Sequence, residues 1–273
     1  MDRSNPRPRP GASYLCPARP PAALPHGHRR MRLAYGDDPS QWLELHRPEG
    51  VSRGLVVVIH GGFWKAQYGA EYAVPLAADL VARGWTAAVV EYRRVGTGPG
   101  GGGGWPATCD DVSAAIDRAV AETDRPDPVV ALGHSAGGHL AAWAAARTRF
   151  DRWADAAPVT HVIDQAGVLD LAAAVRDDLG DGAAQAFMGA TPDHPSYDLA
   201  DPLRQVPLDV PVWAVHARDD DTVPFGQAED YVTAARRAGG EAFLVEVAGG
   251  HFGVIDPASD AWAAVVEVLD SIG

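Results

Sequence analysis

The segment GHSAG, residues 133–137, constrains the fold of this chain more than any other part of the sequence. It joins an apolar run at 129–132, which predicts a β-strand, to an alanine-rich stretch at 136–146, which predicts a helix. Only a tight, strained turn connects a strand to a helix over so few residues, and the small residues around Ser135 allow such a turn to close. We therefore expect Ser135 at the carboxyl edge of a sheet whose strands alternate with helices.

The rest of the chain repeats this alternation. Strands are predicted at 43–45, 55–59, 86–90, 129–132, 161–169, 211–216 and 242–247, and helices at about 76–83, 108–123, 136–146, 226–237 and 259–269. The run at 55–59 is apolar throughout, as in a strand buried on both faces. There is no internal repeat, and one sheet can take up all of these strands, so the pattern predicts a single domain of the α/β class.

The first thirty residues differ in composition from the rest of the chain. Their seven prolines are interleaved with arginines and show neither helical nor strand periodicity, so we expect 1–30 to be a disordered tail and 31–273 to be the domain. The tail carries +5 and the remainder −18 of a total charge of −13. We expect the tail to be dispensable, with Met31 as an alternative start.

Charge and composition exclude several classes of protein. An acidic body argues against general nucleic-acid binding, which relies on clustered Lys and Arg. The apolar runs are too short to span a membrane, and the first residues lack the apolar core of a secretory signal. Two cysteines, Cys16 and Cys109, cannot form a disulfide framework, which favours a reducing compartment. We expect a cytoplasmic protein without nucleic-acid or membrane partners, and the sequence does not indicate its oligomeric state.

The catalytic partners that a serine needs lie downstream of Ser135. A serine hydroxyl becomes a nucleophile when a histidine takes its proton and an acid orients that histidine. Three aspartates follow one predicted strand and His251 follows the next, and parallel strands end at the same edge of a sheet. We predict Ser135 as nucleophile and His251 as base. Spacing alone does not choose among Asp219, Asp220 and Asp221.

A second glycine-rich motif, HGGFW at residues 60–64, directly follows the strand predicted at 55–59. The oxyanion formed during acyl transfer needs backbone N–H donors, and a glycine turn lets the backbone approach the substrate. The N–H of Ala136, directly after the serine, is expected to be one donor. We expect His60 to brace the turn by hydrogen bonds and not to act as a second base.

These motifs together resemble the α/β-hydrolase fold, over essentially all of residues 31–273. HGGFW, GHSAGGHLAAW and a late His followed by Phe are similar to the kynurenine formamidase (arylformamidase) branch and its esterase relatives. The resemblance implies a mostly parallel sheet of about eight strands, with helices on both faces and a short lid insertion. Its acid commonly lies in a DxxVP pattern, which here favours Asp220, and its HGG turn implies Gly62 and Phe63 as oxyanion-hole residues.

Two aromatic residues are candidates for the substrate pocket. Trp64, beside the expected oxyanion hole, would favour a small acyl group such as formyl or acetyl, or else would pack beneath the turn. Phe252, next to the expected base, is the second candidate. The forty residues between the strands predicted at 161–169 and 211–216 occupy the place of a lid, and their apolar side chains either roof the pocket or cover the sheet; these are Phe187, Met188 and Tyr197.

Other polar residues near the motifs have simpler expected roles. His134 and His139 should pack or hydrogen-bond locally, because no third ligand occurs at a metal-binding spacing. Asp170 is expected to cap a helix or to line the pocket. The glycine run 100–104 is contiguous and ends before the next helix begins, so it predicts a flexible loop and not a dinucleotide site. We expect no metal and no organic cofactor.

The sequence therefore predicts a serine hydrolase that cleaves a carboxylic ester or a small amide through an acyl-enzyme, either arylformamidase-like or a carboxylesterase. The partner is a small-molecule ester or amide. One alternative is a peptidase of the same fold, which is disfavoured because no gating domain fits in 273 residues. Another is a non-catalytic binding protein on this scaffold, which is disfavoured by the intact set of Ser135, Asp220 and His251.

Overall fold

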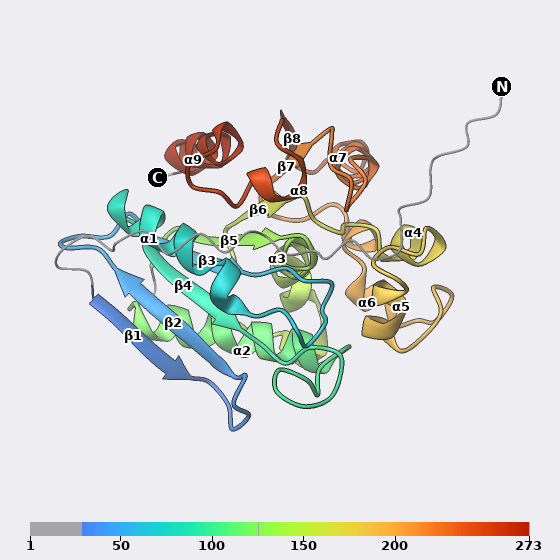
Figure 1. Cartoon of the computed structure of the whole chain (residues 1–273), viewed down its shortest axis with the longest axis horizontal. Coiled ribbons are helices and arrows are strands. Elements are labelled where there is room, and N and C mark those ends of the chain that lie inside the picture. Colours follow the sequence, from blue (N-terminus) through green and yellow to red (C-terminus); the bar gives the residue numbers. More distant parts are fainter. Residues whose placement is uncertain (1–28, 125, 273) are drawn as a thin grey trace.

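The computed structural model describes residues 29–124 and 126–272. Within these residues, eight strands form one sheet in the order β1-β2-β4-β3-β5-β6-β7-β8 (Figure 1). The strands are β1 (Arg29–Ala34), β2 (Trp42–Arg47), β3 (Leu55–Ile59), β4 (Thr86–Glu91), β5 (Val129–His134), β6 (His161–Gln165), β7 (Val212–Ala217) and β8 (Ala242–Val247). β2 pairs antiparallel with β1 and with β4, and the other neighbours are parallel. This confirms the mostly parallel α/β sheet.

Helices cover both faces of the sheet. The α-helices are α1 (Val74–Ala82), α2 (Ala107–Glu122), α3 (Ala136–Ala146), α4 (Leu171–Arg176), α5 (Ala183–Met188), α6 (Tyr197–Ala200), α7 (Gly226–Arg237), α8 (Gly250–Gly253) and α9 (Asp260–Ile272). Along β3, Leu55, Val57 and Ile59 enter the core beneath α2 and α3. Val56 and Val58 enter the core beneath α1 and α9. Successive side chains of a strand point to opposite faces, so a strand covered on both sides is apolar throughout.

The amino-terminal edge of the sheet begins earlier than the composition suggested. Arg29 and Arg30 belong to β1 and pair with β2, so the first strand begins two residues before the expected boundary at residue 31. Arg30 is held by an ion pair with Glu44, whose oxygen lies 2.6 Å from its guanidinium. The rest of the expected tail, including Cys16, lies outside the described residues.

The stretch between β6 and β7 packs as a cover on the sheet. It contains α4, α5 and α6, which lie together at one side of the molecule (Figure 1). Phe187, Met188 and Tyr197 are buried in the core on the α3 face, and Asp170 caps α4 by accepting the N–H of Ala173 at 2.7 Å. Of the two roles open to these apolar residues, the structure therefore shows cover and not pocket roof.

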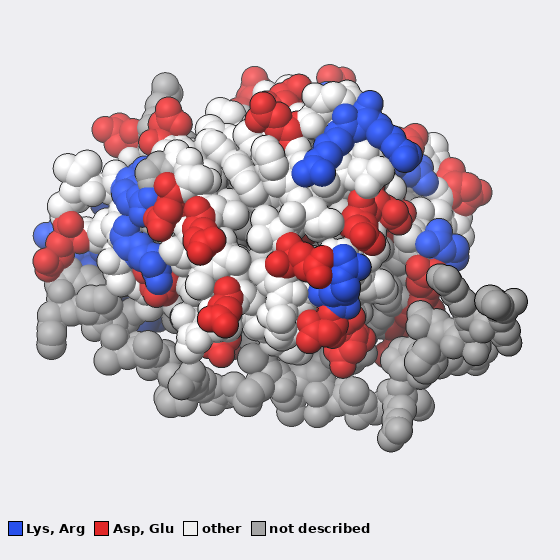
Figure 2. Space-filling view, turned by 90° about the horizontal axis from the view of Figure 1, so that it is seen from above, with Lys and Arg blue, Asp and Glu red and all other residues white. Residues whose placement is uncertain are grey.

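Surface charge is mixed in sign. On the face seen in Figure 2, basic side chains lie beside acidic ones. Some of the opposite charges on the chain form ion pairs, as between Arg218 and Glu246 at 2.6 Å. Among residues 29–124 and 126–272, no helix is long and apolar enough to cross a membrane.

Candidate active site

Ser135 occupies a strained turn between β5 and α3. Its φ of 56° and ψ of −120° lie in a region that residues with a side chain rarely adopt. Two glycines make the turn possible: a Cβ at Gly133 would overlap the carbonyl of Gly137, and a Cβ at Gly137 would overlap the carbonyl of Ile59. The close approach of these backbones fixes the serine at the carboxyl end of β5, at the positive end of the α3 dipole.

Asp220 and His251 meet at the same edge of the sheet, after β7 and β8. Nδ1 of His251 donates to Oδ2 of Asp220 at 2.8 Å. Oδ1 of Asp220 accepts the backbone N–H groups of Thr222 and Val223, also at 2.8 Å each. Burial by itself would raise the pKa of Asp220, but the hydrogen bonds from His216 and His251 outweigh it and hold that pKa well below its usual range. The acid is therefore charged at neutral pH.

The two neighbouring aspartates make different contacts. Asp219 accepts the backbone N–H of Gly250 at 3.2 Å, and Asp221 accepts the hydroxyl of Thr222 at 3.2 Å. Asp220 is thus the aspartate of the three that the fold joins to His251.

Ser135 and His251 line one small cavity. Its volume is about 40 Å³, and it is lined by Gly61, Gly62, Phe63, Tyr68, Tyr72, His134, Ser135, Thr222, His251, Phe252 and Ile255. Within residues 29–124 and 126–272, the Ser135 hydroxyl makes no hydrogen bond. In catalytic sites without bound substrate, the nucleophile and the base often lie too far apart for a hydrogen bond, so this geometry is compatible with a catalytic serine.

Gly61, Gly62 and Phe63 of the HGGFW turn line this cavity together with Ser135. Gly62, Phe63 and Trp64 have φ values of 108°, 51° and 54°, and Lys65 closes the turn by donating its N–H to the carbonyl of Gly62 at 2.9 Å. Gly62 and Phe63 line the cavity, and their role as oxyanion-hole residues stays a prediction. Ala136 is buried as the first residue of α3, so only its backbone N–H is available for that purpose.

His60 braces the turn from below. Its Nδ1 lies 2.8 Å from the carbonyl of Gly61, and its ring stacks on Tyr92 with the centroids 4.4 Å apart. The hydroxyl of Tyr92 donates to the carbonyl of His60 at 2.7 Å. Burial and the charge of Arg94 lower the pKa of His60 to about 3, so it is neutral at physiological pH.

Trp64 does not lie where we expected a pocket residue. Its side chain is fully buried, stacked on Phe187 at 4.8 Å and edge-on to His139 at 5.2 Å, and it is absent from the cavity wall as the structure describes it. The physical reason is that packing against Phe187 and His139 removes the large apolar indole from water. Phe252 does line the cavity, with its ring edge-on to His251 at 5.1 Å.

The sequence of this chain matches the sequence model of the BD-FAE family over residues 43–234, which is more than half of its length. The chain belongs to the BD-FAE family. The match contains the serine turn, the HGGFW turn and the three aspartates, and it ends before His251.

A curated relative and two solved structures are similar to this BD-FAE chain. Esterase LipC of Mycobacterium tuberculosis (strain ATCC 25618 / H37Rv) is 28% identical over 228 residues, which are 77% of this chain and 55% of LipC; the chain thus spans about half the length of that relative.

Both structures are esterases and share the fold. Esterase B of Lactobacillus rhamnosis, with a bound phosphonate inhibitor, has a TM-score of 0.76 at 19% identity over 92% of this chain and 86% of that one. Est2 of Thermogutta terrifontis has a TM-score of 0.69 at 23% identity, and the match covers 89% of this chain and 90% of Est2. The BD-FAE chain therefore has the α/β-hydrolase fold that its motifs resemble.

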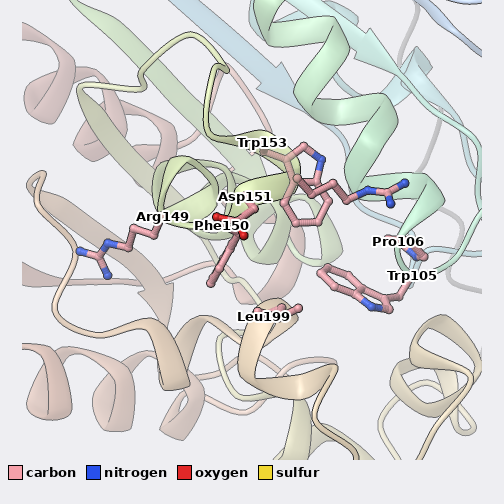
Figure 3. Close-up of a pocket in the computed structure, with 8 residues that line it drawn as sticks. Trp105, Pro106, Arg149, Phe150, Asp151, Trp153 and Leu199 are labelled. Carbon is pink, nitrogen blue, oxygen red and sulfur yellow. The ribbon is translucent and has the colours of Figure 1, made fainter.

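A second, larger cavity lies elsewhere on the BD-FAE domain. It measures about 500 Å³ and is lined by Trp105, Pro106, Arg149, Phe150, Asp151, Arg152, Trp153 and Leu199. Figure 3 shows three aromatic rings and Leu199 around one space, with the Arg149 guanidinium turned away from it. It shares no residue with the cavity at Ser135, so the predicted chemistry lies in the smaller hollow.

The structure also places at the site residues that the sequence did not, among them His134, Tyr68 and Tyr72. His134 donates through Nε2 to the carbonyl of His251 at 2.9 Å, and burial together with His251 lowers its pKa to about 3. His134 is therefore a neutral ring that supports the backbone at His251. Tyr68 and Tyr72 close the cavity from the loop after HGGFW, and only their closeness to that motif in the sequence could have pointed to them.

Proposed function

We propose that this protein is a serine esterase for substrates with a small acyl group. The observation that carries the proposal is that a serine in a strained turn, a histidine paired with a charged aspartate, and a glycine turn line one cavity at the carboxyl edge of the sheet. This combination is the one that acyl transfer through a covalent intermediate requires.

In the proposed reaction, His251 takes the proton of the Ser135 hydroxyl through Nε2, while Nδ1–H stays bonded to Asp220. The serine oxygen attacks the carbonyl carbon, and the carbonyl oxygen becomes an oxyanion. The intermediate collapses when His251 returns the proton to the leaving alcohol, which leaves an ester on Ser135. Water repeats the sequence, with His251 as base, and releases the carboxylic acid.

The backbone near Ser135 is proposed to hold the oxyanion. The N–H of Ala136 lies at the first position of α3, where the helix dipole also favours negative charge. Gly62 and Phe63 face the same cavity from the other side. The loss of one such donor typically lowers the rate by about 10²- to 10³-fold.

The size of the cavity supports a small acyl group. Its volume of about 40 Å³ is far below the roughly 300–1,000 Å³ of pockets that enclose drug-sized ligands. A formyl, acetyl or similar group fits beside Ser135, and the remainder of the substrate then lies in solvent. The names of the similar proteins agree with ester hydrolysis. LipC and esterase B are both called esterases, and esterase B was studied with a phosphonate inhibitor.

A small aryl formamide is the second candidate substrate. Formyl is the smallest acyl group, which suits the cavity, and the HGGFW turn resembles that of arylformamidases. The burial of Trp64 removes one reason for this choice, because its ring is not available to contact an acyl group.

Turnover of p-nitrophenyl acetate, butyrate and octanoate, with N-formylkynurenine in parallel, tests the proposal. We expect the acetate to have the highest kcat/KM among the esters and the octanoate the lowest. Faster turnover of the formamide than of any ester would make the arylformamidase interpretation correct. No hydrolysis of any of the four by folded protein would overturn the esterase proposal and favour the non-catalytic alternative.

A further inference from the structure

We infer that His216 is a positioning residue that holds the carboxylate of Asp220 through the same oxygen that His251 contacts, an inference that rests on the proposed function. His216 is the penultimate residue of β7, and its side chain is fully buried. Its Nε2 lies 3.2 Å from Oδ2 of Asp220, the same oxygen that accepts from His251 at 2.8 Å. Two histidines therefore share one carboxylate oxygen, and the proposed mechanism uses only one of them.

The hydrogen on the His216 ring is fixed by its neighbours. Nε2 faces two acceptors, Oδ2 of Asp220 and the carbonyl of Val223, the latter at 3.0 Å. An unprotonated nitrogen there would oppose two lone pairs, so Nε2 carries the hydrogen and shares it between both oxygens. The edge of the ring contacts Phe225, whose centroid is 5.7 Å away at an interplanar angle of 74°. The ring is thus held in one orientation by packing and by hydrogen bonding.

With His216 included, Asp220 accepts four hydrogen bonds, two on each oxygen. Oδ1 takes the N–H groups of Thr222 and Val223, and Oδ2 takes those of His216 and His251. A carboxylate has about four lone-pair sites, so this one is saturated and cannot rotate or become protonated without losing a partner. His216 also draws part of the negative charge on Oδ2 away from His251. Without it, more of that charge would act on His251 and stabilise its protonated form.

Other titratable groups surround this pair, and they bear on its pH dependence. Asp164 on β6 is fully buried, and burial raises its pKa to about 7 although His216 opposes the change. Below that pH Asp164 is mostly protonated and places no negative charge near His216. Tyr231 from α7 faces Asp164, and burial raises its pKa well above its usual value. His134 contacts the base from β5 as a neutral ring, while Asp219 holds the backbone before it.

The pH profile of kcat/KM for the fastest p-nitrophenyl ester tests the role of His216. The His216→Leu variant removes the donor, and we expect the acidic limb of the profile to move up by about one pH unit and kcat to fall by about 10- to 100-fold. The His216→Gln variant keeps an N–H at the position of Nε2, so it should restore the limb and most of kcat. Phe225→Leu is the matched control, because it loosens the packing of the His216 ring without removing a hydrogen bond. The acidic limb of its pH profile should stay at the wild-type position.

The outcomes separate this inference from the proposed function. An active wild type with an unmoved limb in His216→Leu, or a His216→Gln variant no better than His216→Leu, overturns the inference and leaves the esterase intact. If His216→Leu does not fold, His216→Asn replaces it, because its shorter amide does not reach Asp220 and should behave as Leu does. If no ester is turned over, the inference is tested by the low-field proton NMR resonance of the His251–Asp220 hydrogen bond. A shift of this resonance in His216→Asn that His216→Gln reverses supports the inference. An unchanged resonance in His216→Asn refutes it.

Discussion

Replacement of Asp220 by asparagine changes one atom at the point where His251 is oriented. In the protein, Oδ1 accepts two backbone N–H groups at 2.8 Å, those of Thr222 and Val223. The amide oxygen of the Asp220→Asn variant takes that place, because an NH₂ group would oppose both donors. The NH₂ group then faces Nδ1 of His251, where Oδ2 now accepts at 2.8 Å.

The magnitude of the effect depends on the tautomer of the base. Nδ1 of His251 must accept from the new NH₂ group, so the ring hydrogen moves to Nε2, the nitrogen that should take the proton of Ser135. An aspartate-to-asparagine change that enforces the wrong tautomer lowers kcat by about 10⁴-fold, which is about 5 kcal/mol of transition-state stabilisation. KM should change little, because Asp220 does not line the cavity wall in the described part of the chain.

Steady-state kinetics on p-nitrophenyl acetate measure this loss, with thermal unfolding as a check on folding. Asp219→Asn is the matched control. Oδ1 of Asp219 accepts the N–H of Gly250, and an amide oxygen can keep this hydrogen bond, so we expect a loss of less than about tenfold. A larger loss in Asp219→Asn than in Asp220→Asn would refute the assignment. So would an Asp220→Asn variant that keeps more than a tenth of the wild-type kcat.

Three further predictions concern the turn and the core. Gly62→Ala should lower kcat by at least about 100-fold, since φ is 108° there and a Cβ would overlap the Tyr68 side chain; unchanged ester kinetics would contradict this. Trp64→Ala should reduce the free energy of unfolding in urea by about 3–5 kcal/mol, because the indole is fully buried against Phe187; a loss below about 1 kcal/mol would show that the site is not a packed core position. Asp164→Asn should flatten the pH dependence of stability. Burial raises the folded pKa of Asp164 from 3.8 to about 7, so the folded state binds more protons and the wild type loses up to about 4 kcal/mol as pH rises through this window; equal losses in both proteins between pH 4.5 and 7.5, measured by urea titration, would count against it.

Several helices and strands of this fold could be predicted closely from the sequence. β3, α3, α7 and β8 occupy the predicted ranges, 55–59, 136–146, 226–237 and 242–247. These elements are bounded by glycines or by abrupt changes in polarity, and their apolar residues are spaced so that they form a face that can be buried. β1 was missed because five of its six residues are exposed, so no apolar period marks it and only its pairing with β2 makes it a strand.

The site could be predicted from the sequence only in part. The order of Ser135, Asp220 and His251 along the chain is explained by strand ends that meet at one edge. The direction of a side chain is not predictable in this way, because the residues that bury Trp64, Phe187 and His139, are distant from it in the sequence. His216 escaped notice for a similar reason: its contact with Asp220, four residues later, exists only after the chain turns sharply at the end of β7.

Covalent labelling by a fluorophosphonate, read by intact mass and peptide mapping, tests most directly whether Ser135 is an activated nucleophile. We expect folded wild-type protein to gain one phosphonyl group on Ser135, and Ser135→Ala to gain none. We also expect Asp220→Asn to label far more slowly than Asp219→Asn. Folded wild-type protein that gains no mass, or a Ser135→Ala variant that labels as fast as wild type, would contradict the proposal that this cavity carries out acyl transfer.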